Sequence, residues 1–264
     1  MALDVVSAAH PLTSRSRDSW ALWYLGYPDQ ALARSQEAVT LAQQIAHPMS
    51  LSFALGEAAV CHQFHREGQA AQAHAEAALH LATDQGFPHW RAYSTIVKGW
   101  VLAHQGEAKE GIAQLHQGMI ARRATGAALA RPYFLSLLVE AQGAMGQPEA
   151  GLTVLAEALT HTDTTGERWY EAELYRLKGE LLLQQNSDNQ AEAETCFHKA
   201  IAIAQSQQAK SWELRAAMSL ARLWQQQGKQ AEAHELLAPI YGWFTEGFDT
   251  ADLQEAKALL EALT

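Results

Sequence analysis

Residues 86–126 read GFPHWRAYSTIVKGWVLAHQGEAKEGIAQLHQGMIARRATG, and three glycines divide this stretch into two segments of equal length. The same spacing of twenty residues continues along the chain through Gly86, Gly106, Gly126, Gly146 and Gly166, with Asn186 at the next place. Glycine, and less readily asparagine, adopts the left-handed backbone conformation that ends a helix. A stop every twenty residues therefore predicts helices of about four turns, joined in pairs into a repeating helical hairpin.

The repeat predicts one continuous all-α domain, because stacked hairpins bury their apolar faces on each other and need no central core. We expect a right-handed α-solenoid of about six hairpins that resemble tetratricopeptide repeats, followed by a capping helix. The expected segments are an irregular lead-in or truncated repeat at 1–18, a solenoid at 19–264 with hairpins at about 19–47, 50–85, 88–125, 127–165, 167–208 and 211–244, and a cap at 250–263.

Prolines and a short insertion mark the turns between the predicted helices. Pro28 and Pro148 each stand two residues after a glycine, where a helix tolerates proline in its first turn. Gly68 marks the inner turn of the second hairpin, and the polar residues 186–189 are an insertion in the fifth. This insertion explains why the next inner turn, Gly228, comes two residues late in the repeat.

The positions of small residues indicate the type of repeat. A hairpin of two twenty-residue segments is nearer in length to a HEAT repeat than to the usual tetratricopeptide repeat of about 34 residues. However, tetratricopeptide helices approach closely at one position before the inner turn and two after it, and Gly99, Gly111 and Gly118 occupy these positions around Gly106. Around Gly228, Ala221 and Ala233 occupy the first and second close positions and Trp224 occupies the aromatic position of the repeat, whereas Val139 replaces the small residue of the fourth hairpin. We therefore expect long tetratricopeptide-like repeats.

Composition excludes several classes of function. A hydrophobic share of 48% with 18% charged residues is typical of a globular protein, and no apolar run is long enough to cross a membrane. A formal charge of −10 disfavours direct binding to nucleic acid. The first twelve residues lack the pattern of a secretory signal, which predicts a cytoplasmic protein.

Motifs for catalysis and for cofactor binding are absent from the sequence. It contains no GxxxxGK[ST] loop, no GxSxG and no HExxH, so we expect neither an enzyme nor a bound cofactor. The strongest metal candidate is the set Cys61, His62 and His65, in which the two histidines are one helical turn apart. Ligands from a single helix do not complete a site, and an ordinary pair of surface or groove histidines is the favoured interpretation.

The candidate functional surface is the concave side of the stack. In a tetratricopeptide superhelix the first helix of each hairpin lines this side, so its residues can be counted from the inner turn. The predicted partner groove consists of Tyr93, Trp100, His104, Tyr133, Glu140, Glu173, Arg176, Glu180, Arg215 and Arg222, after His62 and His65 in the second hairpin. Aromatic side chains would provide contact area and arginines would pair with carboxylates. Alternatively, Trp100 and Tyr133 belong to the core, and Glu173, Arg176 and Glu180 pair along one helix.

Four segments carry a resemblance to a known family. They are LGYPDQALA (25–33), GERWYEAELYRLKGELLL (166–183), QAKSWELRAAMSLARLW (208–224) and GKQAEAHELLAPIYGWFTEGFDTADLQEAKALL (228–260). They resemble the C-terminal tetratricopeptide region of large bacterial signalling proteins, in which this region follows a class III nucleotide cyclase domain and an AAA-type ATPase domain. The resemblance implies a regulatory solenoid similar to that of the maltose-regulator class. Neither activity carries over, because this sequence has no cyclase or ATPase segment.

These observations predict a non-catalytic scaffold in signal transduction that binds a protein or peptide segment, with a cyclase or ATPase domain as the candidate partner. A solenoid that senses a small metabolite is the alternative, and it would need a mostly apolar concave pocket with a few polar groups. The aromatic start, Trp20, Trp23 and Tyr24, is expected to be either a homodimer surface or a face that lacks an upstream repeat.

Overall fold

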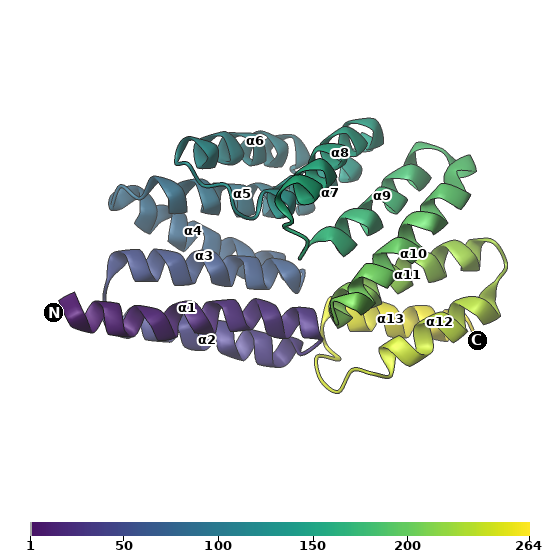
Figure 1. Cartoon of the computed structure of the whole chain (residues 1–264), viewed down its shortest axis with the longest axis horizontal. Coiled ribbons are helices and arrows are strands. Elements are labelled where there is room, and N and C mark those ends of the chain that lie inside the picture. The colour runs from purple at the N-terminus through teal and green to yellow at the C-terminus, as the bar shows by residue number, and fades with distance from the viewer. Residues whose placement is uncertain (1) are drawn as a thin grey trace. The chain divides into compact units, whose positions relative to one another are not determined.

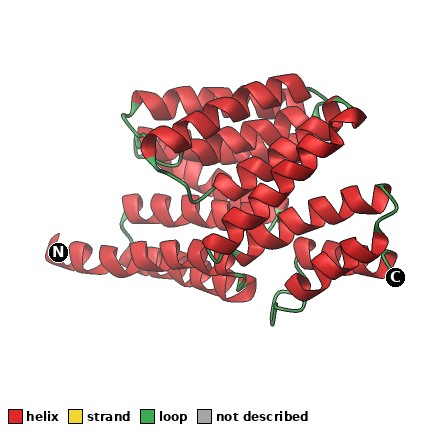
Figure 2. Ribbon diagram, turned by 45° about the vertical axis from the view of Figure 1, so that its right-hand side comes forward, coloured by secondary structure: helices red, strands yellow, loops and turns green. Residues whose placement is uncertain are grey.

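The computed structural model describes residues 2–264, with side chains from Leu12 onward, and in this range the chain is all helical (Figures 1 and 2). The first helices are α1 (Ala2–Leu25), α2 (Pro28–Ile45), α3 (Pro48–Phe64), α4 (Gly68–Asp84), α5 (Pro88–His104) and α6 (Ala108–Ala124). The later ones are α7 (Arg131–Ala144), α8 (Pro148–Thr165), α9 (Glu171–Gln185), α10 (Gln190–Ser206), α11 (Lys210–Gln226), α12 (Gln230–Tyr241) and α13 (Ala251–Ala262), with a 3₁₀ turn at Ser187–Asn189. The predicted all-α fold is confirmed.

Contacts divide the described chain into two compact units. The first contains residues 2–23 and Pro28–Leu129, and the second contains Tyr24–Tyr27 and Ala130–Thr264. The sequence predicted a single continuous solenoid over 19–264, and that continuity stays a prediction. No helix of the described residues is both long and apolar enough to span a bilayer.

The first unit stacks its helices in two layers. Helix α3 contacts α2, α4 and α5, and α5 also contacts α4 and α6. One cluster of buried apolar side chains runs through α1–α4, from Leu12 through Ala38 and Leu55 to Ala78. Each helix therefore buries its apolar stripe on its neighbours, as expected of a repeat protein.

The second unit repeats this arrangement over seven helices. Helices α7, α9, α11 and α13 each contact the next in that series, while α8, α10 and α12 each contact the two helices that flank them in sequence. We call the series α7, α9, α11 and α13 the inner layer. Its helices contact one another directly, and the helices on the inner side of a stack are the more closely spaced ones. Its core includes Phe197 of α10, Leu214 of α11 and Leu253 of α13.

The turns follow the predicted glycine spacing, with two corrections. The five glycines from Gly86 to Gly166 have φ between +67° and +94°, which confirms the left-handed stops. Asn186 does not follow them: its φ is −157°, and its side chain accepts a hydrogen bond from the Asp188 amide at 3.0 Å, which starts the 3₁₀ turn. In the second hairpin the left-handed residue is Arg66, with φ +62°, because α3 ends before Gly68, which opens α4.

The N-terminal part of the chain begins with a helix. The sequence left open an irregular lead-in or a truncated repeat over 1–18, and α1 is helical from Ala2 onward. Trp20 and Trp23 are 7% and 2% exposed. The ring of Trp23 stacks on Phe64 of α3 with centroids 5.1 Å apart, and Trp20 meets the same ring edge-on at 5.5 Å. The expectation of an exposed aromatic start was therefore wrong for both tryptophans, because α1 packs this face on α3.

Helices α5 and α6 touch through glycine. A Cβ added to Gly111 would lie 2.5 Å from the Gly99 carbonyl oxygen and 2.7 Å from the Ala103 amide nitrogen. A Cβ added to Gly118 would lie 2.6 Å from Cγ1 of Ile96. These distances leave no room for a side chain, so the close approach predicted for the third hairpin is confirmed.

Candidate partner-binding surface

The predicted groove residues of the first unit divide into core and surface. Tyr93 and Trp100 are 4% and 2% exposed, so they pack between helices. His104 is exposed, its ring lies 4.1 Å from that of Trp100, and its Nδ1 lies 3.0 Å from the Trp100 carbonyl oxygen. In this unit, only His104 of the three predicted residues on α5 is open to a partner.

Tyr133 belongs to an aromatic cluster in the core of the second unit. It has no exposed surface, and its ring lies 5.3 Å from Tyr170 and 5.9 Å from Trp169. Tyr170 in turn meets Trp212 of α11 edge-on at 4.9 Å. Tyr133 is therefore a core residue of the second unit, which was the alternative that the sequence left open.

An ion-pair network lies on the inner layer at α9. The Arg176 guanidinium donates to Glu173 at 2.7 and 2.8 Å and to Glu180 at 3.1 Å. Burial would lower the pKa of Arg176, but the carboxylates of Glu173 and Glu180 raise it overall. The Ser219 hydroxyl of α11 donates to Glu180 at 2.6 Å, so the network extends from one inner helix to the next.

Glu140 of α7 is half-buried and acts on the same region through its charge. Burial, then Glu173 and Glu140, raise the pKa of the Tyr170 hydroxyl. Glu140 also contributes to raising the pKa of Arg176. The structure thus brings Glu140, Glu173, Arg176 and Glu180 into one electrostatic group on α7 and α9.

The last two predicted arginines pair with carboxylates of the last helix, α13. Arg215 Nε lies 2.7 Å from Asp252, and both side chains are nearly buried, at 11% and 12% exposure. Arg222 lies 2.9 Å from Glu255, and these side chains are 43% and 38% exposed. Asp252 and Glu255 face α11 and are functional candidates that the sequence missed. Their spacing of three residues on one helix was the available signal.

A third missed residue is Glu57 of α3. Its side chain is 3% exposed, and its Oε1 accepts a hydrogen bond from the Tyr93 hydroxyl at 3.2 Å. Burial raises the pKa of this carboxyl to about 7, against the opposing effects of Arg17 and Tyr93. Its position in the apolar run of α3 gave no reason to single it out from the sequence.

The three residues proposed as a metal site are arranged for other roles. His62 Nδ1 lies 2.5 Å from Glu67, and the His62 ring stacks on His74 with centroids 5.0 Å apart. His65 is buried, with its two ring nitrogens 2.7 Å from the Cys61 carbonyl oxygen and 3.1 Å from that of Pro28. Burial raises the pKa of the Cys61 thiol to about 12, and the described residues contain no group of three ligands suited to a metal.

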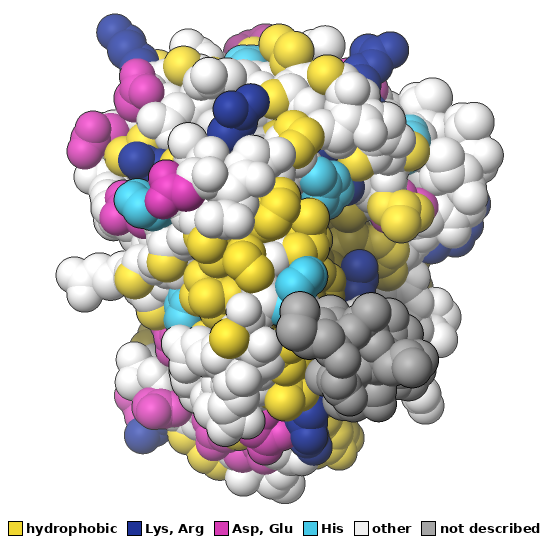
Figure 3. All heavy atoms as spheres, turned by 90° about the vertical axis from the view of Figure 1, so that its left-hand side faces the viewer, with side chains coloured by type: hydrophobic (Ala, Val, Ile, Leu, Met, Phe, Trp, Pro, Cys, Tyr) yellow, Lys and Arg dark blue, Asp and Glu magenta, His cyan; other side chains and the backbone are white. Residues whose placement is uncertain are grey.

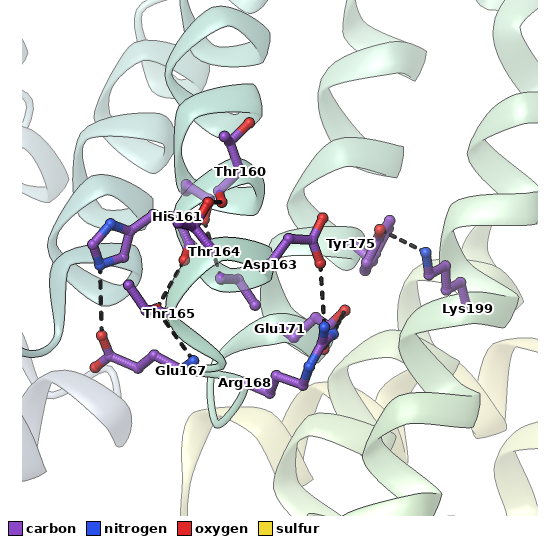
Figure 4. A network of polar contacts seen from close by, with 12 residues as sticks. Thr160, His161, Asp163, Thr164, Thr165, Glu167, Arg168, Glu171, Tyr175 and Lys199 are labelled. Atoms are coloured by element: carbon purple, nitrogen blue, oxygen red, sulfur yellow. Dashed lines mark hydrogen bonds and ion pairs between the residues drawn. The ribbon is translucent and has the colours of Figure 1, made fainter.

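The turn between α8 and α9 carries a further polar network (Figure 4). Arg168 bridges Glu171 at 2.9 Å and Asp163 at 3.3 Å, and His161 lies 3.9 Å from Glu167. On the neighbouring α10, Lys199 donates to the Tyr175 hydroxyl at 2.6 Å. These contacts connect neighbouring helices locally, and none of them is made by a predicted groove residue.

Comparison with known proteins places the fold and leaves the family open. No family model matches the chain. A curated relative, an uncharacterized protein of Rhizobium meliloti (strain 1021), is 26% identical over 204 residues, which are 77% of this chain and 20% of the relative. The chain therefore spans about a fifth of the length of that relative.

Three solved structures have the same architecture. A Rap protein complexed with competence and sporulation factor has a TM-score of 0.66 at 15% identity, over 97% of this chain and 80% of that one. Aspartyl phosphate phosphatase F of Bacillus subtilis has a TM-score of 0.61 at 12% identity, over 88% and 59%. A signal transduction ATPase with a tetratricopeptide repeat sensor from Pyrococcus horikoshii has a TM-score of 0.51 at 15% identity, over 97% and 38%. The fold is thus a tetratricopeptide-like helical repeat.

Proposed function

We propose that this chain is a non-catalytic regulatory module that binds a segment of a partner protein along the inner layer of its second unit. One observation carries the proposal most directly. Polar side chains join successive inner helices at Glu180–Ser219, Arg215–Asp252 and Arg222–Glu255. A continuous strip of charged groups across α9, α11 and α13 offers repeated hydrogen-bond partners to an extended segment, which is how helical repeats commonly bind peptides.

The charged groups of this strip differ in exposure: some are buried in ion pairs, and others are accessible to a partner. Glu173 is 1% exposed and Arg215 is 11% exposed, so a partner reaches neither without opening a buried ion pair. Arg222 and Glu255 are roughly two-fifths exposed. An exposed pair contributes only about 0.2–1 kcal/mol, so a partner carboxylate can replace Glu255 at small cost. Arg222 is therefore the contact we assign to the partner.

The structural neighbours support this type of role, since one of them is a Rap protein complexed with competence and sporulation factor. From the sequence resemblance, we also propose that the partner segment belongs to a signalling protein with a cyclase or ATPase domain. A cytoplasmic location, which we also propose, fits such a partner.

A peptide display selection tests the proposal. Random peptides are selected against the whole chain, and the affinities of the selected peptides are measured for wild type, Arg222→Glu and Lys257→Glu. Lys257 is the matched control, because it lies on α13 in an exposed pair with Glu261. We expect Arg222→Glu to weaken binding by about tenfold or more and Lys257→Glu to leave it unchanged.

Two results would contradict the proposal. One is a selection that yields no peptide with affinity above background. The other is a set of peptides that bind Arg222→Glu as tightly as wild type. Far-ultraviolet circular dichroism of each variant shows whether the helices remain intact, and the exposure of Arg222 leads us to expect that they do.

A further inference from the structure

The carboxylate of Glu57 is buried where three helices of the first unit, α1, α3 and α5, meet. Glu57 of α3 is 3% exposed, and its Oε1 accepts a hydrogen bond from Tyr93 of α5 at 3.2 Å. The indole nitrogen of Trp20 of α1 donates to the Glu57 backbone carbonyl at 3.4 Å. Side chains from α1 and α5 thus surround this residue on both sides.

The second carboxylate oxygen of Glu57, Oε2, lacks a hydrogen-bond donor among the residues that the structure describes. Oε2 is buried and accepts no hydrogen bond from any described residue. The cation beside it is Arg17 of α1, whose Nε lies 4.0 Å away, which is too far for a hydrogen bond. A buried, ionised carboxylate with an unpaired oxygen is unfavourable, so a donor that reached Oε2 would be bound favourably.

Arg17 is held weakly. Its side chain is 59% exposed, and its guanidinium carbon lies 5.4 Å from the centroid of the Trp20 ring. Arg15, two residues earlier, is turned away toward Glu37, at 3.5 Å. The chain therefore already places a guanidinium over an aromatic ring and beside a carboxylate, which is an arrangement suited to recognising arginine.

We propose that Glu57, Tyr93 and Trp20 form a binding site for an arginine side chain of a partner segment, and that Arg17 occupies this site until the partner displaces it. The incoming guanidinium donates to Oε2 of Glu57 and lies against the ring of Trp20, while Tyr93 continues to hold Oε1. That the arginine belongs to a protein segment rests on the proposed function. The recognition of a guanidinium rests on the site alone.

The probe is the tripeptide N-acetyl-Ala-Arg-Ala-amide, titrated into the full chain labelled with ¹⁵N at tryptophan. The indole N–H signal of Trp20 reports binding, because this N–H donates a hydrogen bond to the Glu57 backbone carbonyl. The signal is identified by its loss in Trp20→Phe. Removing the internal competitor with Arg17→Gln should raise the affinity by about two- to fivefold, as expected for a long, weak ion pair whose arginine is exposed. Glu57→Gln should lower the affinity by about thirtyfold or more.

Matched controls isolate the two residues. Arg15→Gln removes a neighbouring arginine of α1 that faces Glu37, so the affinity should stay at the wild-type value. The peptide N-acetyl-Ala-Gln-Ala-amide should not bind. An affinity that is the same in Arg17→Gln and wild type, or the same in Glu57→Gln and wild type, would overturn the proposal.

A pH series tests the same site without altering Glu57. Because the carboxyl of Glu57 has a pKa near 7, lowering the pH from 8 to about 5.5 should protonate it and abolish binding of the arginine tripeptide. The groups that face it are Arg17 of α1 and Tyr93 of α5, with Cys61 one turn further on α3. The ring of His89 lies 6.3 Å from that of Tyr93, so the series is repeated in His89→Gln. Binding that is equally strong at both pH values would contradict a carboxylate anchor.

A further titration distinguishes an arginine side chain of a protein segment from free arginine. Free L-arginine should bind more weakly than the tripeptide, because its charged amino and carboxyl groups must also be accommodated. If free arginine binds at least as tightly, the site is one for a small metabolite and the partner-segment assignment is wrong. Failure of all these arms would leave the proposed function standing, because the display experiment measures binding that depends on Arg222 and not on Glu57.

Discussion

Glu57 couples the stability of the first unit to pH, because its carboxyl group is buried between helices. Burial raises its pKa from 4.5 to about 7. Between these two values the folded state holds a proton that the unfolded state has released. The stability that this proton contributes is therefore complete below pH 4.5 and is lost as the pH rises toward 7.

We expect Glu57→Gln to remove this dependence, since glutamine has the same shape and does not titrate. The free energy of unfolding of wild type relative to Glu57→Gln should fall by about 2–3 kcal/mol between pH 5 and pH 8. Urea unfolding at several pH values measures it. Glu37→Gln is the control, because Glu37 is about half exposed and its substitution should leave the pH profile unchanged. A constant difference between wild type and Glu57→Gln across this range would show that the carboxyl is already ionised at pH 5.

Single residues also decide which predicted groove positions a partner can reach. Arg215 and Arg222 are both arginines of α11, seven residues apart, yet Arg215 is nearly buried against Asp252 and Arg222 remains accessible beside Glu255. Removing one member of a buried pair strands the other charge, whereas an exposed pair is screened by water. The same residue type thus serves the fold at one position and is available for binding at the other.

At the scale of elements, helices α5 and α6 pack closely because the glycines at their contact have no side chains. Gly99 and Gly111 let the backbones of α5 and α6 approach, and each would place an added Cβ under 3 Å from backbone atoms of the other helix. Backbone atoms cannot rotate away as a side chain can. A methyl group at this contact therefore has to push the two helices apart.

We expect Gly111→Ala to destabilise the protein by about 2 kcal/mol, within the range for overpacked contacts. Gly68→Ala is the matched control: Gly68 opens α4, and an added Cβ there would have no atom within 4 Å. It should be neutral or stabilising by up to about 1 kcal/mol, because alanine favours the helix. Thermal and urea unfolding compare the two variants. Equal stability of Gly111→Ala and wild type would show that the helices separate without cost.

At the scale of the whole molecule, the excess of acidic residues determines which partners approach. The sequence has 29 acidic and 19 basic residues, for a formal charge of −10. On the face drawn in Figure 3, basic side chains stand among acidic ones around a band of hydrophobic side chains. Such a surface attracts a basic segment at long range and still offers it apolar contacts.

This charge predicts a salt-dependent association with basic segments. The rate constant for association of an arginine-containing peptide should fall several-fold between about 50 mM and 500 mM NaCl, because added salt screens the attraction. Stopped-flow fluorescence measures the rate. A peptide in which glutamine replaces arginine should show little change, and duplex DNA should not bind at either salt concentration. Equal salt dependence for both peptides would exclude electrostatic steering.

The sequence by itself determined the helical repeat, its glycine turns and the close glycine contacts of the third hairpin. These features are local: a left-handed stop at Gly106 or a helix face with Gly99 depends on nearby residues and a fixed period. Tertiary structure decided the site, including the burial of Tyr133, the pairing of Arg215 with Asp252 and the burial of the Glu57 carboxylate with Oε2 unpaired among the described residues. Successive residues of a helix point about 100° apart, so a small rotation of one helix on its neighbour moves a side chain from surface to core. That rotation is set by packing between helices that are distant in sequence, and no local pattern encodes it.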